Sequence, residues 1–68
     1  MEMKLRTRYD EEADAAYIYV DEYAKVDKTV QLNEEINVDL DSKKRIVGIE
    51  ILNAKSKLHL EALEKVAN

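Results

Sequence analysis

The stretch Ile46-Val47-Gly48-Ile49-Glu50-Ile51-Leu52 decides the fold of this chain. It is the longest apolar run in the sequence, it is rich in β-branched residues, and it contains the only glycine. Alternation along a strand sends its odd-numbered residues to one face and its even-numbered residues to the other, where Glu50 is the one charged side chain. A run that is apolar on both faces predicts a strand in the middle of a sheet, with other residues packed above and below it.

Four other segments have the composition of strands. Two show strict period-two alternation, and two are short runs rich in β-branched or aromatic residues. Polar segments that favour turns separate them, among them the acidic run 10–14 and residues 41–44. The predicted strands are Met3 to Tyr9, Ala15 to Val20, Thr29 to Leu32 and Ile36 to Leu40.

From Ala54 onward the apolar period becomes helical, which predicts a helix over about residues 56–67 with Ser56 as its N-cap. The whole chain, 1–68, is therefore predicted to be one α+β domain. Its expected architecture is a small antiparallel sheet of four or five strands within about residues 3–52, built from hairpins, with one C-terminal helix on one face.

Size and charge limit the classes of function. A chain of 68 residues buries a small core, and without cysteine it has neither disulfides nor thiolate metal sites. Oligomerisation is the remaining support, so a homodimer is expected. The net charge of −4 opposes binding to nucleic acid. No segment has the length of a membrane span or the pattern of a signal peptide, so a cytoplasmic protein without membrane contact is expected.

Two acidic segments contain oxygen ligands that a divalent cation prefers. One is the turn that runs from Asp10 to Asp14, and the other is the pair Asp39 and Asp41, which lacks the glycine and distal glutamate of a calcium loop. The alternative is that these carboxylates accept hydrogen bonds from turn amides. The second interpretation is preferred, so no metal and no cofactor are expected.

Two segments carry a resemblance to a known family. Residues 9–18, YDEEADAAYI, are similar to a Y-D-x-x-A-D-A-x-Y-I signature, and NVDLD at 37–41 followed by IVGIEILNA at 46–54 is similar to V-x-V-D-x-D and V-V-G-I-E-I-L-x-A. Over residues 5–54 the chain resembles a family of small prokaryotic proteins, domain of unknown function 2283. The resemblance implies a compact β-rich domain with a C-terminal helix. It brings no catalytic residue, and it implies an antitoxin-type role as the neutralising partner of a small toxin-like protein.

The face of the sheet opposite the expected helix is the candidate functional surface. Alternation predicts that it combines arginine, tyrosine and apolar side chains around Glu50, a mixture that is common at protein interfaces. The expected interface or ligand residues are Arg6, Arg8, Tyr17, Tyr19, Ile46, Glu50 and Leu52.

Two functions compete for this surface. The first is a small acidic protein-interaction domain that self-associates, because one helix cannot shield both faces of a sheet and exposed apolar patches mark interaction sites. The alternative is a small ligand-binding or enzymatic domain that uses the polar and aromatic groups around Glu50. The chain contains no recognisable nucleophile or phosphate-binding loop, so an enzyme is the less favoured hypothesis, and no catalytic residue is assigned.

Overall fold

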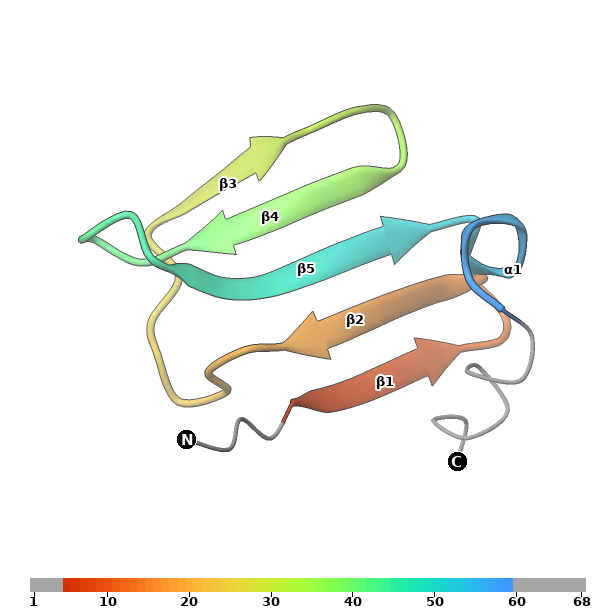
Figure 1. Cartoon of the computed structure of the whole chain (residues 1–68), viewed down its shortest axis with the longest axis horizontal. Helices are drawn as coiled ribbons and strands as arrows, with labels where there is room; N and C mark the ends of the chain where they lie inside the picture. Colours follow the sequence, from red (N-terminus) through yellow and green to blue (C-terminus); the bar gives the residue numbers. More distant parts are fainter. Residues whose placement is uncertain (1–4, 60–68) are drawn as a thin grey trace.

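The apolar run 46–52 forms strand β5, Ile46–Leu52, at the centre of a five-stranded antiparallel sheet (Figure 1). The structure is a computed structural model and describes residues 5–59. The strand order is β1-β2-β5-β4-β3, and one short helix follows the sheet, which confirms the predicted α+β fold. The remaining elements are β1 (Arg6–Asp10), β2 (Ala15–Tyr19), β3 (Lys28–Gln31), β4 (Ile36–Leu40) and α1 (Ala54–Lys57).

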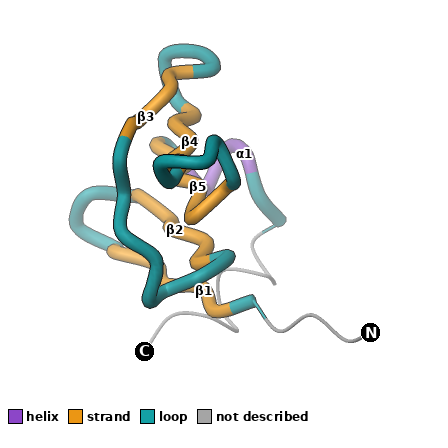
Figure 2. Tube along the Cα trace, turned by 90° about the vertical axis from the view of Figure 1, so that its left-hand side faces the viewer, coloured by secondary structure: helices purple, strands orange, loops and turns teal. Residues whose placement is uncertain are grey.

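The strands follow a Greek key. β3, β4 and β5 are joined by hairpins, and the long connection 20–27 links β2 to β3 so that β2 lies beside β5 (Figures 1 and 2). Hydrogen bonds fix both ends of this connection. The Val20 and Asp21 amides donate to the Val47 carbonyl at 2.9 and 3.0 Å, and the Asp27 amide donates to the Leu40 carbonyl at 2.8 Å. β1 completes the sheet through a hairpin with β2.

The hairpin turns are built around aspartate and asparagine side chains. Asp10 Oδ1 accepts the Glu12 amide at 3.0 Å, Asn33 Oδ1 accepts the Glu35 amide at 2.8 Å, and Asp41 Oδ1 accepts the Lys43 amide at 2.8 Å. Each side chain satisfies backbone donors that no strand partner reaches. The polar segments that separate the apolar runs therefore turn the chain where the sequence predicts.

A β-bulge interrupts the pairing of β4 with β5. Asp39 lies opposite Gly48, but the next pair is Leu40 with Ile46, so Val47 is the extra residue. Strict alternation assigns Ile46 to the same face as Gly48. The bulge instead places Ile46 on the face of its partner Leu40, which is a correction to the predicted surface.

The helix begins earlier than predicted. α1 starts at Ala54, and Leu58 is already extended with φ −120° and ψ 155°. Ser56 lies inside the helix, where its hydroxyl donates to the Asn53 carbonyl at 2.9 Å, so the predicted N-cap at Ser56 is wrong. The rest of the predicted helix, from residue 60, lies outside the described residues. Asp14 replaces the expected cap, because its Oδ1 accepts the Lys55 amide at 3.1 Å.

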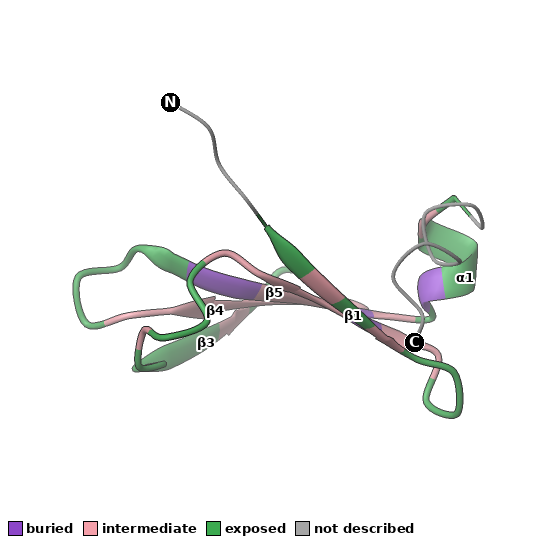
Figure 3. Cartoon of the chain, turned by 90° about the horizontal axis from the view of Figure 1, so that it is seen from below, coloured by how far each residue is buried: buried purple, intermediate pink, exposed green. Residues whose placement is uncertain are grey.

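The core of the described part is small. Ala16, Val47, Ile51 and Ala54 are the buried apolar residues, and none of the large side chains is fully buried. α1 packs at one end of the sheet, where Ala54 joins Ala16 and Ile51, and the rest of the sheet is a single layer (Figure 3). No helix among residues 5–59 is long and apolar enough to cross a membrane.

Candidate functional site

One face of the sheet is polar and aromatic across all five strands. The pairing registers align two rows, one from Arg6 on β1 to Thr29 on β3 and the other from Arg8 to Gln31. We call this surface the polar-aromatic face. Its residues are Arg6, Arg8, Asp10, Ala15, Tyr17, Tyr19, Thr29, Gln31, Asn37, Asp39, Gly48, Glu50 and Leu52.

Tyr17 is the organising side chain of this face. It starts on β2, crosses β5 above Gly48, and donates its hydroxyl hydrogen to Asp39 Oδ2 on β4 at 2.5 Å. A Cβ at position 48 would overlap the Tyr17 ring and hydroxyl, so this crossing requires glycine. The single glycine of the chain therefore serves a contact that joins three strands.

Asp39 and Glu50 are both held by neutral donors. Asp39 also accepts the Thr29 hydroxyl at 2.6 Å, and Glu50 Oε1 accepts the Asn37 side-chain amide at 3.0 Å. Burial of the Tyr17 ring and its hydrogen bond to Asp39 raise the pKa of Tyr17. Tyr17 therefore stays a protonated donor at neutral pH, which suits a structural role better than catalysis by a phenolate.

Arg6 closes the β1 end of the face. Its guanidinium lies 5.3 Å from the centre of the Tyr19 ring and pairs with Glu22 Oε2 at 2.5 Å. Tyr19 in turn meets Tyr17 edge to face, with 4.7 Å between ring centres and 67° between planes. Arg6 thus contacts Tyr19, and Tyr19 contacts Tyr17, across β1 and β2.

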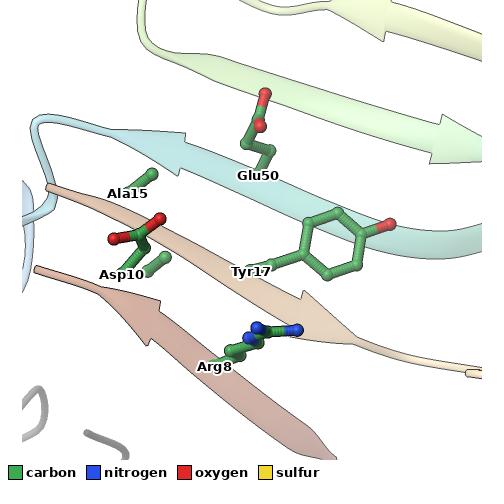
Figure 4. Close-up of a pocket in the computed structure, with 6 residues that line it drawn as sticks. Arg8, Asp10, Ala15, Tyr17 and Glu50 are labelled. Atoms are coloured by element: carbon green, nitrogen blue, oxygen red, sulfur yellow. The ribbon is translucent and has the colours of Figure 1, made fainter. Parts of the chain in front are cut away.

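A shallow pocket of about 150 Å³ lies next to these tyrosines, over the start of β2 (Figure 4). Ala15 and Ala16 line it at the start of β2. Arg8 and Tyr17 line it on one side, and the carboxylates of Asp10 and Glu50 complete the wall. It therefore offers a guanidinium, two carboxylates and an aromatic ring to a small ligand.

The structure brings together most residues of the predicted surface. Arg6, Arg8, Tyr17, Tyr19, Glu50 and Leu52 share the polar-aromatic face through their registers, and only Ile46 leaves it because of the bulge. The sequence did not predict that Asn37, Asp39 and Thr29 form side-chain hydrogen bonds on this face. Alternation already points Asn37 and Asp39 away from the apolar side chains of β4, but the strand order that sets them opposite Glu50 and Gly48 is not readable from one sequence.

The aspartates of the acidic turns accept hydrogen bonds from nearby backbone amides and side chains. Asp10 accepts the amides of the turn that follows it, and Asp14 Oδ1 accepts the Tyr9 hydroxyl at 2.8 Å. Asp41 accepts the Arg45 amide and, through Oδ2, Arg45 Nε at 2.8 Å, and these contacts lower the pKa of Asp41. Among residues 5–59, no three histidine, cysteine or acidic side chains are grouped as metal ligands.

The opposite face is apolar. Its middle row runs from Thr7 through the neighbouring strands to Val30, and most of its side chains are only partly buried. Within the strands its one charged residue is Lys28, at the β3 edge. We call this surface the apolar face. Its remaining residues are Thr7, Tyr9, Ala16, Ile18, Val30, Ile36, Val38, Leu40, Ile46, Val47, Ile49 and Ile51.

Comparison with known proteins gives a family but no activity. The model of the family described as "Protein of unknown function (DUF2283)" matches residues 6–55. The chain is 38% identical over 66 residues to an uncharacterized protein of Methanocaldococcus jannaschii, and the match covers 97% of this chain and 55% of that relative. The chain thus spans about half the length of this curated relative. No solved structure matches the chain significantly.

Proposed function

This chain belongs to the DUF2283 family of proteins of unknown function, and we propose that it is a small interaction domain that self-associates through its apolar face. The observation that carries the proposal is a continuous apolar row over five strands that no second layer covers within the described residues. Such a surface costs free energy in water, roughly 25 cal/mol for each Å² of apolar area left exposed. Binding of a partner that buries this apolar area removes the same free-energy cost.

A second copy is the occupant that the chemistry favours. In a chain of which 38% of residues are charged, the apolar face has one charged strand residue, Lys28, and it lies at the edge. A neutral apolar surface needs no charge complement, so it can meet its own copy across a two-fold axis. Two sheets then pack about 10 Å apart and form the core that one sheet lacks. Strand alternation alone favoured the other face, but there Tyr17 already donates to Asp39 and Asn37 already donates to Glu50.

Sedimentation of the wild type and three lysine variants tests this contact. Val38→Lys places a charge at the middle of the apolar face, and Ile46→Lys places one at a residue that is 48% exposed, where the fold tolerates it more easily. Ser42→Lys adds the same charge in the exposed turn of the same hairpin and serves as the control. We expect the wild type and Ser42→Lys to have the same associated mass, at least that of a dimer, and the two apolar-face variants to have a lower mass.

A wild type that is monomeric at tens of micromolar would overturn self-association. The apolar face would then be free for a different protein, as the antitoxin-type role of a neutralising partner requires. Variants of the apolar face that keep the wild-type mass while remaining folded by circular dichroism would place the contact elsewhere on the molecule.

The pocket supports a second candidate function, the binding of a small ligand on the polar-aromatic face. Its guanidinium and carboxylates match a small zwitterion with both an acidic and a basic group. Titration with glycine as the probe, followed by NMR, should shift the signals of Arg8, Tyr17 and Glu50, and Arg8→Ala should abolish the shifts. Signals that do not move at millimolar glycine would remove this class of ligand.

A further inference from the structure

The two edges of the sheet both present outward backbone groups but differ in the side chains beside them. The Leu32 amide donates to the Ile36 carbonyl at 2.8 Å, and bonded pairs alternate along an antiparallel ladder, so Val30 bonds β4 as well. Thr29 and Gln31 are the residues between these pairs. Their amides and carbonyls therefore point away from β4, along the open edge of β3.

We propose that this edge pairs with β3 of a second copy, so that two sheets join into one continuous antiparallel sheet. The two-fold axis would pass through Val30. Thr29 then exchanges hydrogen bonds with the partner's Gln31, and the symmetry repeats the exchange on the other side of the axis. Every outward group within β3 gains a partner in this register.

The side chains of β3 are compatible with that register. Val30 faces its own copy, and Thr29 faces Gln31, so no two like charges are opposed. Lys28 lies opposite the partner's Leu32, a side chain that is 64% exposed in one chain and that the lysine stem can cover.

The β1 edge opposes the same kind of pairing. The bond from the Val20 amide to Val47 sets the alternation of β2, which leaves Thr7 and Tyr9 of β1 with outward backbone groups. Pairing centred on Thr7 sets Arg6 against the partner's Arg8, and pairing centred on Arg8 sets that arginine against its copy. The register centred on Tyr9 avoids this repulsion, but the turn begins at Glu11, so only residues 8–10 could pair. On the other edge, the bond from the Leu32 amide to Ile36 extends the ladder, so residues 28–32 can pair about Val30. Of the two edges of the sheet formed by residues 6–52, β3 is thus the one whose side chains allow this pairing.

Amide hydrogen exchange tests the pairing directly in the wild-type chain. The Val30 amide lies in the ladder with β4 and is protected in either case, so it is the internal reference. We expect the Thr29 and Gln31 amides to exchange at least about tenfold more slowly than free amides, and more slowly still at higher protein concentration. Fast exchange of both amides at a concentration where the chain is associated would overturn the edge pairing.

Gln31→Pro provides an independent test, because it removes one outward amide and no bond of the internal ladder. Gln31→Ala keeps the amide and is its matched control. We expect Gln31→Pro alone to halve the associated mass.

The inference does not depend on the apolar face, and the two contacts can be separated. If both form, Gln31→Pro leaves a face-paired dimer and Val38→Lys leaves an edge-paired one. If Gln31→Pro is folded and keeps the wild-type mass, the edge contact is wrong while self-association through the face stands.

Discussion

At the scale of single residues, the signature segments of this family perform structural tasks that the fold makes visible. Tyr17, Gly48 and Asp39 come from three adjacent strands and form one contact, in which the ring occupies the space that a side chain at position 48 would need. Asp14 joins the first hairpin to the helix through Tyr9 and Lys55. The carboxylates of Asp14 and Asp39, which in the sequence resemble metal-binding or catalytic groups, thus accept hydrogen bonds from within the chain.

Gly48→Ala should destabilise the domain by about 1–3 kcal/mol, because the new methyl group overlaps the Tyr17 ring. Urea unfolding measures the loss. The same substitution in a Tyr17→Ser background should cost less, since the ring is gone, and this double-mutant cycle separates the steric clash from a change in strand propensity. Equal losses in the two backgrounds would contradict the proposed clash.

Stability should fall at alkaline pH because of two tyrosines. Partial burial and the hydrogen bond to Asp14 raise the pKa of Tyr9 to about 12, and burial and Asp39 raise the pKa of Tyr17. The contribution is complete below the pKa of an unfolded tyrosine, about 10, and is lost as the pH rises through the folded values, since the unfolded chain releases its protons first. Tyr9→Phe and Tyr17→Phe should each flatten the dependence of the urea midpoint on pH between 9 and 12. An unchanged slope in both variants would show that lysines alone cause it.

At the scale of elements, polar side chains at the turns decide where strands end and how the helix starts. Asp14, Lys44 and Asn53 adopt left-handed backbone with φ of 50°, 64° and 53°, and each lies in a segment that joins two elements. The helix start depends on a residue 40 positions away in the first hairpin rather than on its own sequence, because Asp14 accepts from Ala54 through its carbonyl and from Lys55 through its carboxylate.

Asp14→Ala should therefore loosen the first hairpin and the helix together. It removes the acceptor of the Tyr9 hydroxyl and the Lys55 amide and places alanine in left-handed backbone, which together cost about 1–3 kcal/mol. Thermal unfolding measures the change. Glu12→Ala in the same exposed turn should have little effect, and a Glu12→Ala loss as large as that of Asp14→Ala would contradict the anchoring role.

At the scale of the whole molecule, the described part is a one-layer sheet with two unlike faces (Figure 3). Tyr17, Thr29 and Asn37 donate to carboxylates of the polar-aromatic face, while within residues 5–59 the apolar face is covered only at the end where α1 packs. A domain of this size gains only about 3–5 kcal/mol from a single core, so the proposed association would add a large share of its stability.

The melting temperature of the wild type should accordingly rise with protein concentration, because the associated form is stabilised by mass action. Calorimetry or circular dichroism over a hundredfold range of concentration measures the effect. In Val38→Lys the melting temperature should be lower and should depend less on concentration. A wild-type melting temperature that is constant over this range would contradict an associated native state.

The amino-acid sequence by itself determined the strands, their hairpins and the central place of Ile46–Leu52, because alternation and turn chemistry are local properties. It also placed Arg6, Arg8, Tyr17, Tyr19 and Glu50 on one face. Three features could be seen in the tertiary structure alone: the strand order, the bulge that moves Ile46, and the bond from Tyr17 to Asp39. Each of them depends on which distant strands lie side by side. The helix start was missed for the same reason. Its cap is Asp14, and a residue so far away in the chain becomes a cap only when the sheet has brought it there.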